Sequence, residues 1–216
     1  FNYSAINNFG ARYAEGDYFL LLNNDTEVIT PDWLENMMGY CQREDVGIVG
    51  AKLLYPDNTV QHAGVVVGIA GFAGHILTGY DRNSTGYLWR LVTAQDESAV
   101  TGACLMVKRS VFEALNGLDE SFAVGLNDID FCLRARALGK LVVFTPDACL
   151  YHYESKSRGL ENTPEKKARL QREVDHFRER YGDFLKAGDP YYNPNLSIVR
   201  GDCAFRMASE KKDEVI

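Results

Sequence analysis

A cluster of three small polar residues directly follows an apolar run and could bind an ion. Residues 18–22 are tyrosine, phenylalanine and three leucines, and Asn23, Asn24 and Asp25 come next. Carboxylate and amide oxygens are the ligands that hard divalent cations prefer, and such a cation can hold phosphate oxygens. Asn and Asp also follow strands simply because they favour turns. The residues alone leave both roles open.

Two aspartates at the start of a predicted helix, residues 128–139, form the second group. Asp130 and Arg134 are four residues apart, which favours an ordinary ion pair on one helix face. Asp128 lies in the first turn, beside a glycine-containing loop at residues 123–127. That place suits a general base, which must face a cleft, and it equally suits a residue that only caps the helix.

The third group is a single histidine, His152, which follows an alternating strand between two tyrosines. A lone histidine is more often structural than catalytic, but a histidine and an aspartate from different strands can share one cation. The sequence contains no GxSxG, P-loop, GxGxxG or HExxH pattern. Nucleophilic catalysis and the common nucleotide-binding loops are therefore not indicated.

Composition narrows the class of protein. The chain has 216 residues with 23 basic and 30 acidic side chains, a net charge of −7 that argues against a nucleic-acid partner. Its five cysteines include no CxxC pair, which favours reduced thiols in a cytoplasm over disulfides or zinc. The most membrane-like run, residues 64–74, contains four glycines and is too short to span a bilayer.

The apolar pattern predicts an α/β fold. The first 55 residues indicate a helix, a strand, a helix with Thr30 as its N-cap, and another strand. The strands are apolar on both faces, as in a mostly parallel central sheet flanked by helices. In such sheets ligands bind beyond the carboxyl ends of strands, where Asn23 to Asp25 are expected. The further predicted elements are a strand at 99–109, helices at 110–115 and 128–139, and two strands at 140–146 and 148–154.

The last part of the chain has a different character. Residues 163–185 predict an amphipathic helix whose apolar stripe contains Leu170, Val174, Phe177 and Tyr181. We therefore expect a catalytic domain at residues 1–159 and, at residues 160–216, a helical extension and tail that pack on it.

Five sequence blocks, taken in order, resemble the family-2 inverting glycosyltransferases of the GT-A fold, in particular their rhamnosyltransferase-like branch. Each block by itself is weakly specific, but five in this order and spacing are typical of the family. The blocks together cover residues 1–159 and are NNFGARYAEGDYFLLLNNDTEV, VGIVGAKLLYPD, QHAGVVVG, TGACLMVKRSVFEALNGLDESF and NDIDFCLRARALGKLVVFTPDACLYHYESKSRG.

The resemblance implies a metal-assisted transfer of a sugar from a nucleotide-diphosphate donor to an acceptor hydroxyl, with inversion. The family's DxD-type motif falls on Asn23, Asn24 and Asp25, so Asp25 would hold Mn²⁺ or Mg²⁺ and His152 would complete the metal site. Because Asn23 replaces the first aspartate of the motif, the metal site has one fewer negative charge. Asp128 matches the general base.

Further residues are implied to bind the donor or the acceptor. Asn127 precedes the base where the family more usually has glutamate. Asn8 matches an asparagine near the donor pocket, and Gly102 and Asp119 belong to blocks on the acceptor side. Asn23 and Asn24 are expected to contact substrate as well.

Family members normally have a strand, a helix and a strand upstream of the position of Phe1, and these elements grip the nucleotide base. Their lack here predicts an incomplete uridine or thymidine pocket. It also predicts an exposed sheet edge, and a homodimer through that edge is one expected consequence.

The expected function is therefore a bacterial hexosyltransferase of cell-surface polysaccharide biosynthesis. Its donor would be UDP- or dTDP-linked, and its acceptor a saccharide or lipid-linked saccharide. It would be cytoplasmic, with peripheral association at the inner membrane face. Two alternatives remain open on the sequence alone: a degenerate module that binds a glycan or a partner without turnover, and a metal-dependent sugar nucleotidyltransferase.

Overall fold

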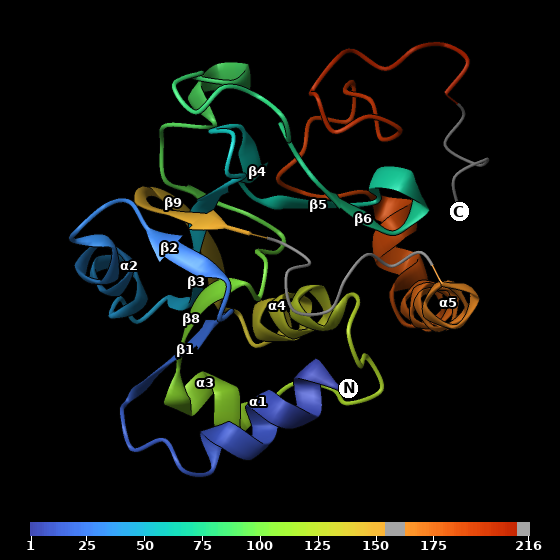
Figure 1. Cartoon of the computed structure of the whole chain (residues 1–216). Helices are drawn as coiled ribbons and strands as arrows, with labels where there is room; N and C mark the ends of the chain where they lie inside the picture. The colour runs from blue at the N-terminus through green and yellow to red at the C-terminus, as the bar shows by residue number, and fades with distance from the viewer. Residues whose placement is uncertain (154–162, 211–216) are drawn as a thin grey trace.

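A central sheet of seven strands organises the molecule (Figure 1). The computed structural model describes residues 1–153 and 163–210. The strand order is β1-β8-β3-β9-β2, with β4 beside β3 and β7 beside β9, and β5 and β6 form a separate hairpin. The strands are β1 Tyr18–Leu22, β2 Thr26–Val28, β3 Val46–Leu54, β4 Val60–His62, β5 Val65–Val67, β6 Ala73–His75, β7 Gln95–Asp96, β8 Cys104–Lys108 and β9 Leu141–His152. The helices are α1 Tyr3–Ala11, α2 Trp33–Cys41, α3 Arg109–Ala114, α4 Asn127–Ala137 and α5 Pro164–Ala187, with 3-10 turns η1 Ile69–Gly71 and η2 Tyr87–Trp89.

The expected α/β class is confirmed, but the prediction of a mostly parallel sheet is wrong. Among the strands of the described residues, only β3 and β9 pair in parallel; every other pairing is antiparallel. β3 is buried at all of its positions. A strand covered on both faces has the same apolar pattern whichever way its neighbour runs. The relative direction of neighbouring strands could therefore not be predicted from this pattern.

The antiparallel pairing of β1 with β8 brings two polar segments together. Leu22, at the end of β1, lies opposite Cys104, at the start of β8. Beyond them the ladder continues, because the Asn23 backbone N–H donates to the Ala103 carbonyl at 2.9 Å. The residues after β1 therefore lie beside the residues before β8, among them Gly102.

β9 was expected as two short strands and is one long strand with an irregularity. Its register on β3 moves from Thr145 opposite Ala51 to Cys149 opposite Lys52. Pro146, within this irregular stretch, has no N–H to give to a ladder, which made the sequence resemble a strand end. Because the strand continues, His152 reaches β2 and pairs with Thr26.

The other predicted elements form with shifted ends. α2 begins at Trp33, not at Thr30, because the residues between them make a turn in which the Trp33 N–H donates to the Thr30 carbonyl. The strand expected at 99–109 is regular only as β8. Thr163 caps α5 as predicted, and its side chain accepts from the Lys166 N–H at 3.3 Å.

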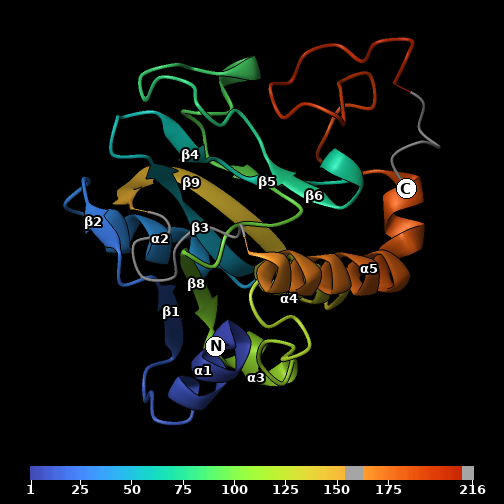
Figure 2. The same ribbon diagram turned by 45° about the vertical axis from the view of Figure 1, so that its right-hand side comes forward.

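Helices cover both faces of the sheet. α2 packs against β3 and β9 on one face, where Met37 and Cys41 are fully buried. α4 packs on the opposite face with Phe131 and Cys132, which are also fully buried. α5 lies beside α4, outside that layer, as Figure 2 shows. Within the described part of the chain, no helix is long and apolar enough to cross a membrane.

Asp130 joins α5 to α4. The predicted pair with Arg134 is present at 2.7 Å, and the other carboxylate oxygen accepts from Arg180 and from the Tyr181 hydroxyl, both at 2.7 Å. Asp130 has no exposed surface. The predicted apolar stripe adds to this contact, because Val174 is buried against the core and Tyr181 packs partly on it.

The tail after α5 returns to the β5–β6 hairpin. Asp189 accepts from the Val67 N–H at 2.8 Å and from the Ser98 hydroxyl at 2.7 Å. The extension thus packs on the same core as the residues before it. The expected domain boundary at residue 159 falls outside the described residues, and the division into 1–159 and 160–216 stays a prediction.

Replacing Asp130 with alanine is expected to lower the free energy of unfolding by about 3 kcal/mol or more, because it leaves Arg180 and Arg134 without their buried partner. Asp45→Ala is the matched control: Asp45 also pairs with an arginine at 2.7 Å, but both side chains are 52% exposed. Urea unfolding followed by circular dichroism measures both. Equal shifts of the two midpoints would mean that Asp130 stabilises the fold no more than an exposed ion pair does.

Candidate active site

A cavity of about 700 Å³ lies where the ends of β1 and β9 meet the start of α4. Its wall also includes residues from α1, β4 and β6 and from the segment before β8. The structure brings seven of the nine predicted site residues to this cavity, namely Asn23, Asn24, Asp25, Gly102, Asn127, Asp128 and His152.

Asp25 and His152 form a close pair in the wall of the cavity. Oδ1 of Asp25 lies 3.2 Å from Nε2 of His152, and each side chain is 11% exposed. Gln61 sets the tautomer of this histidine. Its amide nitrogen donates to the His152 backbone carbonyl at 3.3 Å, so its oxygen faces Nδ1, 2.7 Å away. Nδ1 therefore carries the proton in the neutral ring, and the lone pair of Nε2 faces the carboxylate.

Two acceptor atoms at this distance favour a positive charge between or beside them. An aspartate oxygen and a neutral imidazole nitrogen are suitable ligands for Mn²⁺ or Mg²⁺, so the residues fit the cation that the sequence predicts. The Asn23 side-chain nitrogen lies 3.1 Å from Nε2 of His152, and its N–H donates to that lone pair. Among the described residues no third histidine, cysteine or carboxylate joins the pair. Further ligands would have to be amide oxygens, water or substrate oxygens.

Asp128 also lines the cavity and is held by the chain before β8. Its Oδ2 accepts from the Gly102 N–H at 2.8 Å, and its Oδ1 accepts from the Ile129 N–H at 2.9 Å. The Tyr3 hydroxyl donates to the Gly102 carbonyl at 2.7 Å. A Cβ at position 102 would lie 3.2 Å from that hydroxyl oxygen and 3.4 Å from the Asp128 Cβ. Glycine at this position therefore permits the close approach that fixes the carboxylate.

Glu173, which the sequence analysis did not predict as a site residue, holds the loop that leads to Asp128. Both carboxylate oxygens of Glu173, on α5, accept backbone N–H groups, those of Val124 and Gly125, each at 3.0 Å. The Val124 carbonyl in turn accepts from the Asn127 side chain at 2.8 Å. Glu173 is 4% exposed. No local pattern marks it, because it is one of many charged residues in an amphipathic helix.

Two predicted residues lie outside the cavity. Asn8 exchanges two hydrogen bonds with the Leu118 backbone, at 2.8 and 2.9 Å. Asp119 accepts from Ser121 and pairs with Arg180 at 2.7 Å. Although partial burial raises the pKa of Asp119, these bonds and the arginine hold it at about 2. Asn8 thus bonds to the loop between α3 and α4, and Asp119 bonds within that loop and to α5; neither lines the cavity.

The family follows from comparison with known sequences. The model of the family described as "Glycosyltransferase like family 2" matches residues 3–173. The chain belongs to this glycosyltransferase family. The predicted family is therefore confirmed, and the match includes the start of α5 up to Glu173.

Two curated relatives have names that refer to glycan biosynthesis. The chain is 42% identical over 225 residues to the O-antigen biosynthesis protein RfbC of Myxococcus xanthus, covering the whole chain and 16% of that protein. Over 60 residues it is 35% identical to the N-acetylglucosaminyl-diphospho-decaprenol L-rhamnosyltransferase of Mycobacterium tuberculosis, covering 28% of the chain and 20% of that protein. The expected likeness to rhamnosyltransferases is thus confirmed. The chain spans less than a quarter of the length of each of these two relatives.

Solved structures confirm the GT-A fold. The chain aligns with GalNAc-T7, solved with UDP, GalNAc and Mn²⁺, at a TM-score of 0.61 and 13% identity, covering 86% of the chain and 36% of that protein. At this identity the likeness concerns the fold. The core arrangement of sheet and helices is therefore that of a GT-A glycosyltransferase.

Asp25→Asn is expected to weaken Mn²⁺ binding at least about tenfold, because it removes the charged member of the pair with His152. Asp57→Asn is the control, since Asp57 is an exposed turn residue outside the cavity. Titration of Mn²⁺ alone, followed by electron paramagnetic resonance of the free ion, measures the dissociation constant. An unchanged constant in Asp25→Asn would rule out this pair as the metal site.

Glu173→Gln is expected to lower turnover about tenfold or more while the chain stays folded, because one of the two N–H groups before Asp128 loses its acceptor and the base shifts. Glu165→Gln, at an exposed position in the first turn of α5, is the matched control. Rates of sugar transfer are compared with circular dichroism spectra of the same samples. Wild-type turnover in Glu173→Gln would show that the loop needs no such support.

Proposed function

We propose that this chain transfers a sugar from a nucleoside-diphosphate donor to an acceptor hydroxyl, with inversion, with a divalent cation and with Asp128 as the general base. One observation carries the proposal: the Asp25–His152 pair and the Asp128 carboxylate face the same cavity. Membership of the glycosyltransferase family and the relative in O-antigen biosynthesis support a role in polysaccharide biosynthesis.

Asp128 has the chemistry that inversion requires. Its carboxylate would take the proton of the acceptor hydroxyl as the hydroxyl oxygen forms its bond to the anomeric carbon. The bond from that carbon to the diphosphate oxygen breaks on the opposite face, and the electron pair leaves with the diphosphate. A single displacement of this kind inverts the anomeric centre and needs no protein nucleophile.

Asp25 and His152 would hold the cation. Bound there, Mn²⁺ or Mg²⁺ would offset the negative charge of the departing diphosphate. Asn23, in place of an acidic residue, leaves this end of the cavity with one fewer negative charge. Gln61 contributes by keeping the lone pair of His152 Nε2 directed at Asp25.

The substrates are proposed from the relatives and from the resemblance. A UDP- or dTDP-linked sugar is the proposed donor, and a saccharide or lipid-linked saccharide the proposed acceptor. Asn23, Asn24, Gly102 and Asn127 line the cavity in which both would meet. The cytoplasmic location, with association at the inner membrane face, stays a prediction; the five cysteines are free and buried.

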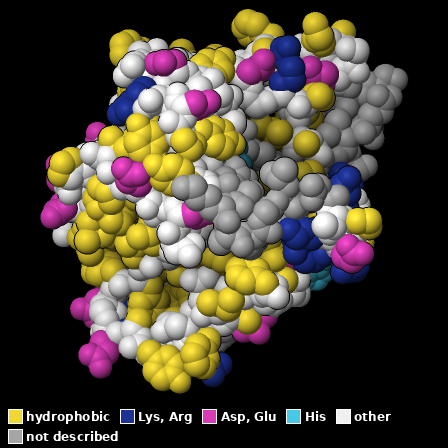
Figure 3. All heavy atoms as spheres, viewed as in Figure 1, with side chains coloured by type: hydrophobic (Ala, Val, Ile, Leu, Met, Phe, Trp, Pro, Cys, Tyr) yellow, Lys and Arg dark blue, Asp and Glu magenta, His cyan; other side chains and the backbone are white. Residues whose placement is uncertain are grey.

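The predicted homodimer through a sheet edge also stays a prediction. Among the described strands β1 is at the end of the sheet. Exposed apolar side chains lie near it on α1 and at its own end, among them Ile6, Phe9 and Leu22, which are 55%, 58% and 43% exposed. Figure 3 shows hydrophobic side chains gathered on this lower part of the molecule.

A non-catalytic module that binds a glycan or a partner is the second candidate. Asparagine at both position 23 and position 127, where the family more usually has acidic residues, favours it. Such a module would keep the cavity and lack turnover.

Asp128→Asn separates the two candidates. The amide oxygen can still accept from the Gly102 N–H, so the fold and nucleotide binding should persist, whereas turnover should fall about 10²- to 10⁴-fold. Proton NMR of reactions with a panel of UDP- and dTDP-sugars measures both the rate and the anomeric configuration of the product. Asp119→Asn, outside the cavity, should react like the wild type. A product of retained configuration, or full activity in Asp128→Asn, would refute the proposed mechanism.

A further inference from the structure

A second pair of histidines lies beside the same cavity, and one of the two lines it. His62, on β4, and His75, on β6, approach with their Nδ1 atoms 3.0 Å apart. Their rings are nearly perpendicular, at 77°, with centroids 4.9 Å apart. At this distance one Nδ1 must carry a proton and the other must accept it.

The surroundings of His62 decide which one donates. The Thr101 backbone N–H faces Nε2 of His62 at 3.4 Å, and a backbone N–H can only donate. Burial, together with the neighbouring His75 and His152, lowers the pKa of His62 well below its usual 6.5, so the ring is neutral. Its single proton is therefore on Nδ1 and is donated to His75. In neutral His75 the proton must then be on the far nitrogen, Nε2.

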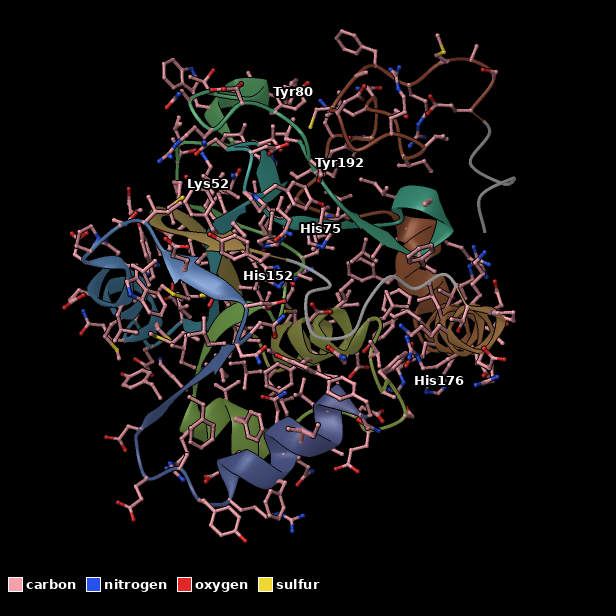
Figure 4. All side chains as sticks on the ribbon, in the orientation of Figure 1. Lys52, His75, Tyr80, His152, His176 and Tyr192 are labelled. Carbon is pink, nitrogen blue, oxygen red and sulfur yellow. The ribbon has the colours of Figure 1, made fainter. Side chains whose placement is uncertain are left out.

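The two rings differ in their access to the cavity. His62 is completely buried. His75 is exposed and lines the cavity together with Thr78 and Thr101. In Figure 4 the labelled His75 and His152 lie in the central region of the molecule, and His176 lies apart from them on α5.

His62 is also linked to the segment that holds the base. Thr101, which donates to His62, immediately precedes Gly102, whose N–H holds the Asp128 carboxylate. The backbone of residues 101 and 102 therefore bonds both to His62, which contacts His75, and to the Asp128 carboxylate. His75 and Asp128 both line the cavity.

We propose that His75 binds the acceptor saccharide, by donating its Nε2–H to a hydroxyl oxygen of the sugar that Asp128 activates, and that His62 is the positioning residue that fixes this tautomer. The inference rests on the proposed function. A hydroxyl suits this group better than a diphosphate does. Because Nδ1 of His75 accepts the proton of His62, Nε2 carries a single N–H, which matches one hydroxyl oxygen.

Three substitutions of His75 test the position of the donor. His75→Gln keeps an N–H where Nε2 lies, His75→Asn moves it to the place of Nδ1, and His75→Phe removes it. We expect the KM for the acceptor to stay near wild type in the glutamine variant and to rise roughly three- to tenfold in the other two. The acceptors are methyl glycosides of rhamnose, glucose and N-acetylglucosamine, and His176→Gln is the control. An equal effect of all three substitutions, or a rise in the donor KM instead, would overturn the proposal.

A measurement that needs no turnover tests the tautomers directly. The chain has four histidines, so ¹⁵N chemical shifts of labelled imidazoles can be assigned by single substitutions. At pH 7 we expect the proton on Nδ1 in His62 and on Nε2 in His75. A proton on Nδ1 of His75 would overturn the assignment of the donor. Lack of transfer by the wild-type chain with every sugar would instead refute the proposed function, and the acceptor role of His75 with it.

Discussion

The antiparallel pairing of β1 with β8 is the constraint on which the candidate active site depends. It puts the end of one strand beside the beginning of the other, and the Asn23 N–H extends the ladder to Ala103. The ion-binding cluster and Gly102 are thereby neighbours, although they are far apart in the sequence. Gly102 then fixes Asp128 through one backbone hydrogen bond. A parallel partner would have placed the opposite end of β8 at this position.

Buried carboxylates extend this arrangement to the end of the chain. Asp130 joins α4 to Arg180 and Tyr181, and Glu173 holds the loop before Asp128. Burying a carboxylate costs free energy unless donors surround it, so these contacts are specific in position. The amphipathic helix α5 therefore supports the candidate base and does not only cover the core.

Much of the fold and part of the site could be predicted from local pattern. The apolar runs of β1 and β3, the short helix α3 and the helix that begins near Asp128 all follow from residue types over a few positions. Seven of the nine predicted site residues lie in one cavity. Three of them, Asn23, Asn24 and Asp25, are there because they directly follow β1, and ligands bind beyond the ends of such strands. The direction of β8, the continuity of β9 past Pro146 and the start of α2 at Trp33 were not predictable, because each depends on backbone partners distant in sequence.

The contacts that orient the site residues could not be predicted from the sequence either. Glu173 and Gln61 carry no sequence signal that separates them from other polar residues, and each acquires its role from a partner about 50 to 90 positions away. Asn8 and Asp119 show the reverse: they belong to blocks that match the family, yet their side chains bond to the loop between α3 and α4. A motif gives the type of residue, whereas its role depends on what the fold places within hydrogen-bond distance.

Asp25 and His152 are proposed to hold a cation against a nucleoside diphosphate in the cavity that contains Asp128. Calorimetric titration of this chain with UDP and with dTDP, each with and without Mn²⁺, tests whether they do. We predict that at least one of the two binds, and that binding requires Mn²⁺. Binding that is the same with and without the metal would contradict the claim, as would no binding by a chain shown to be folded.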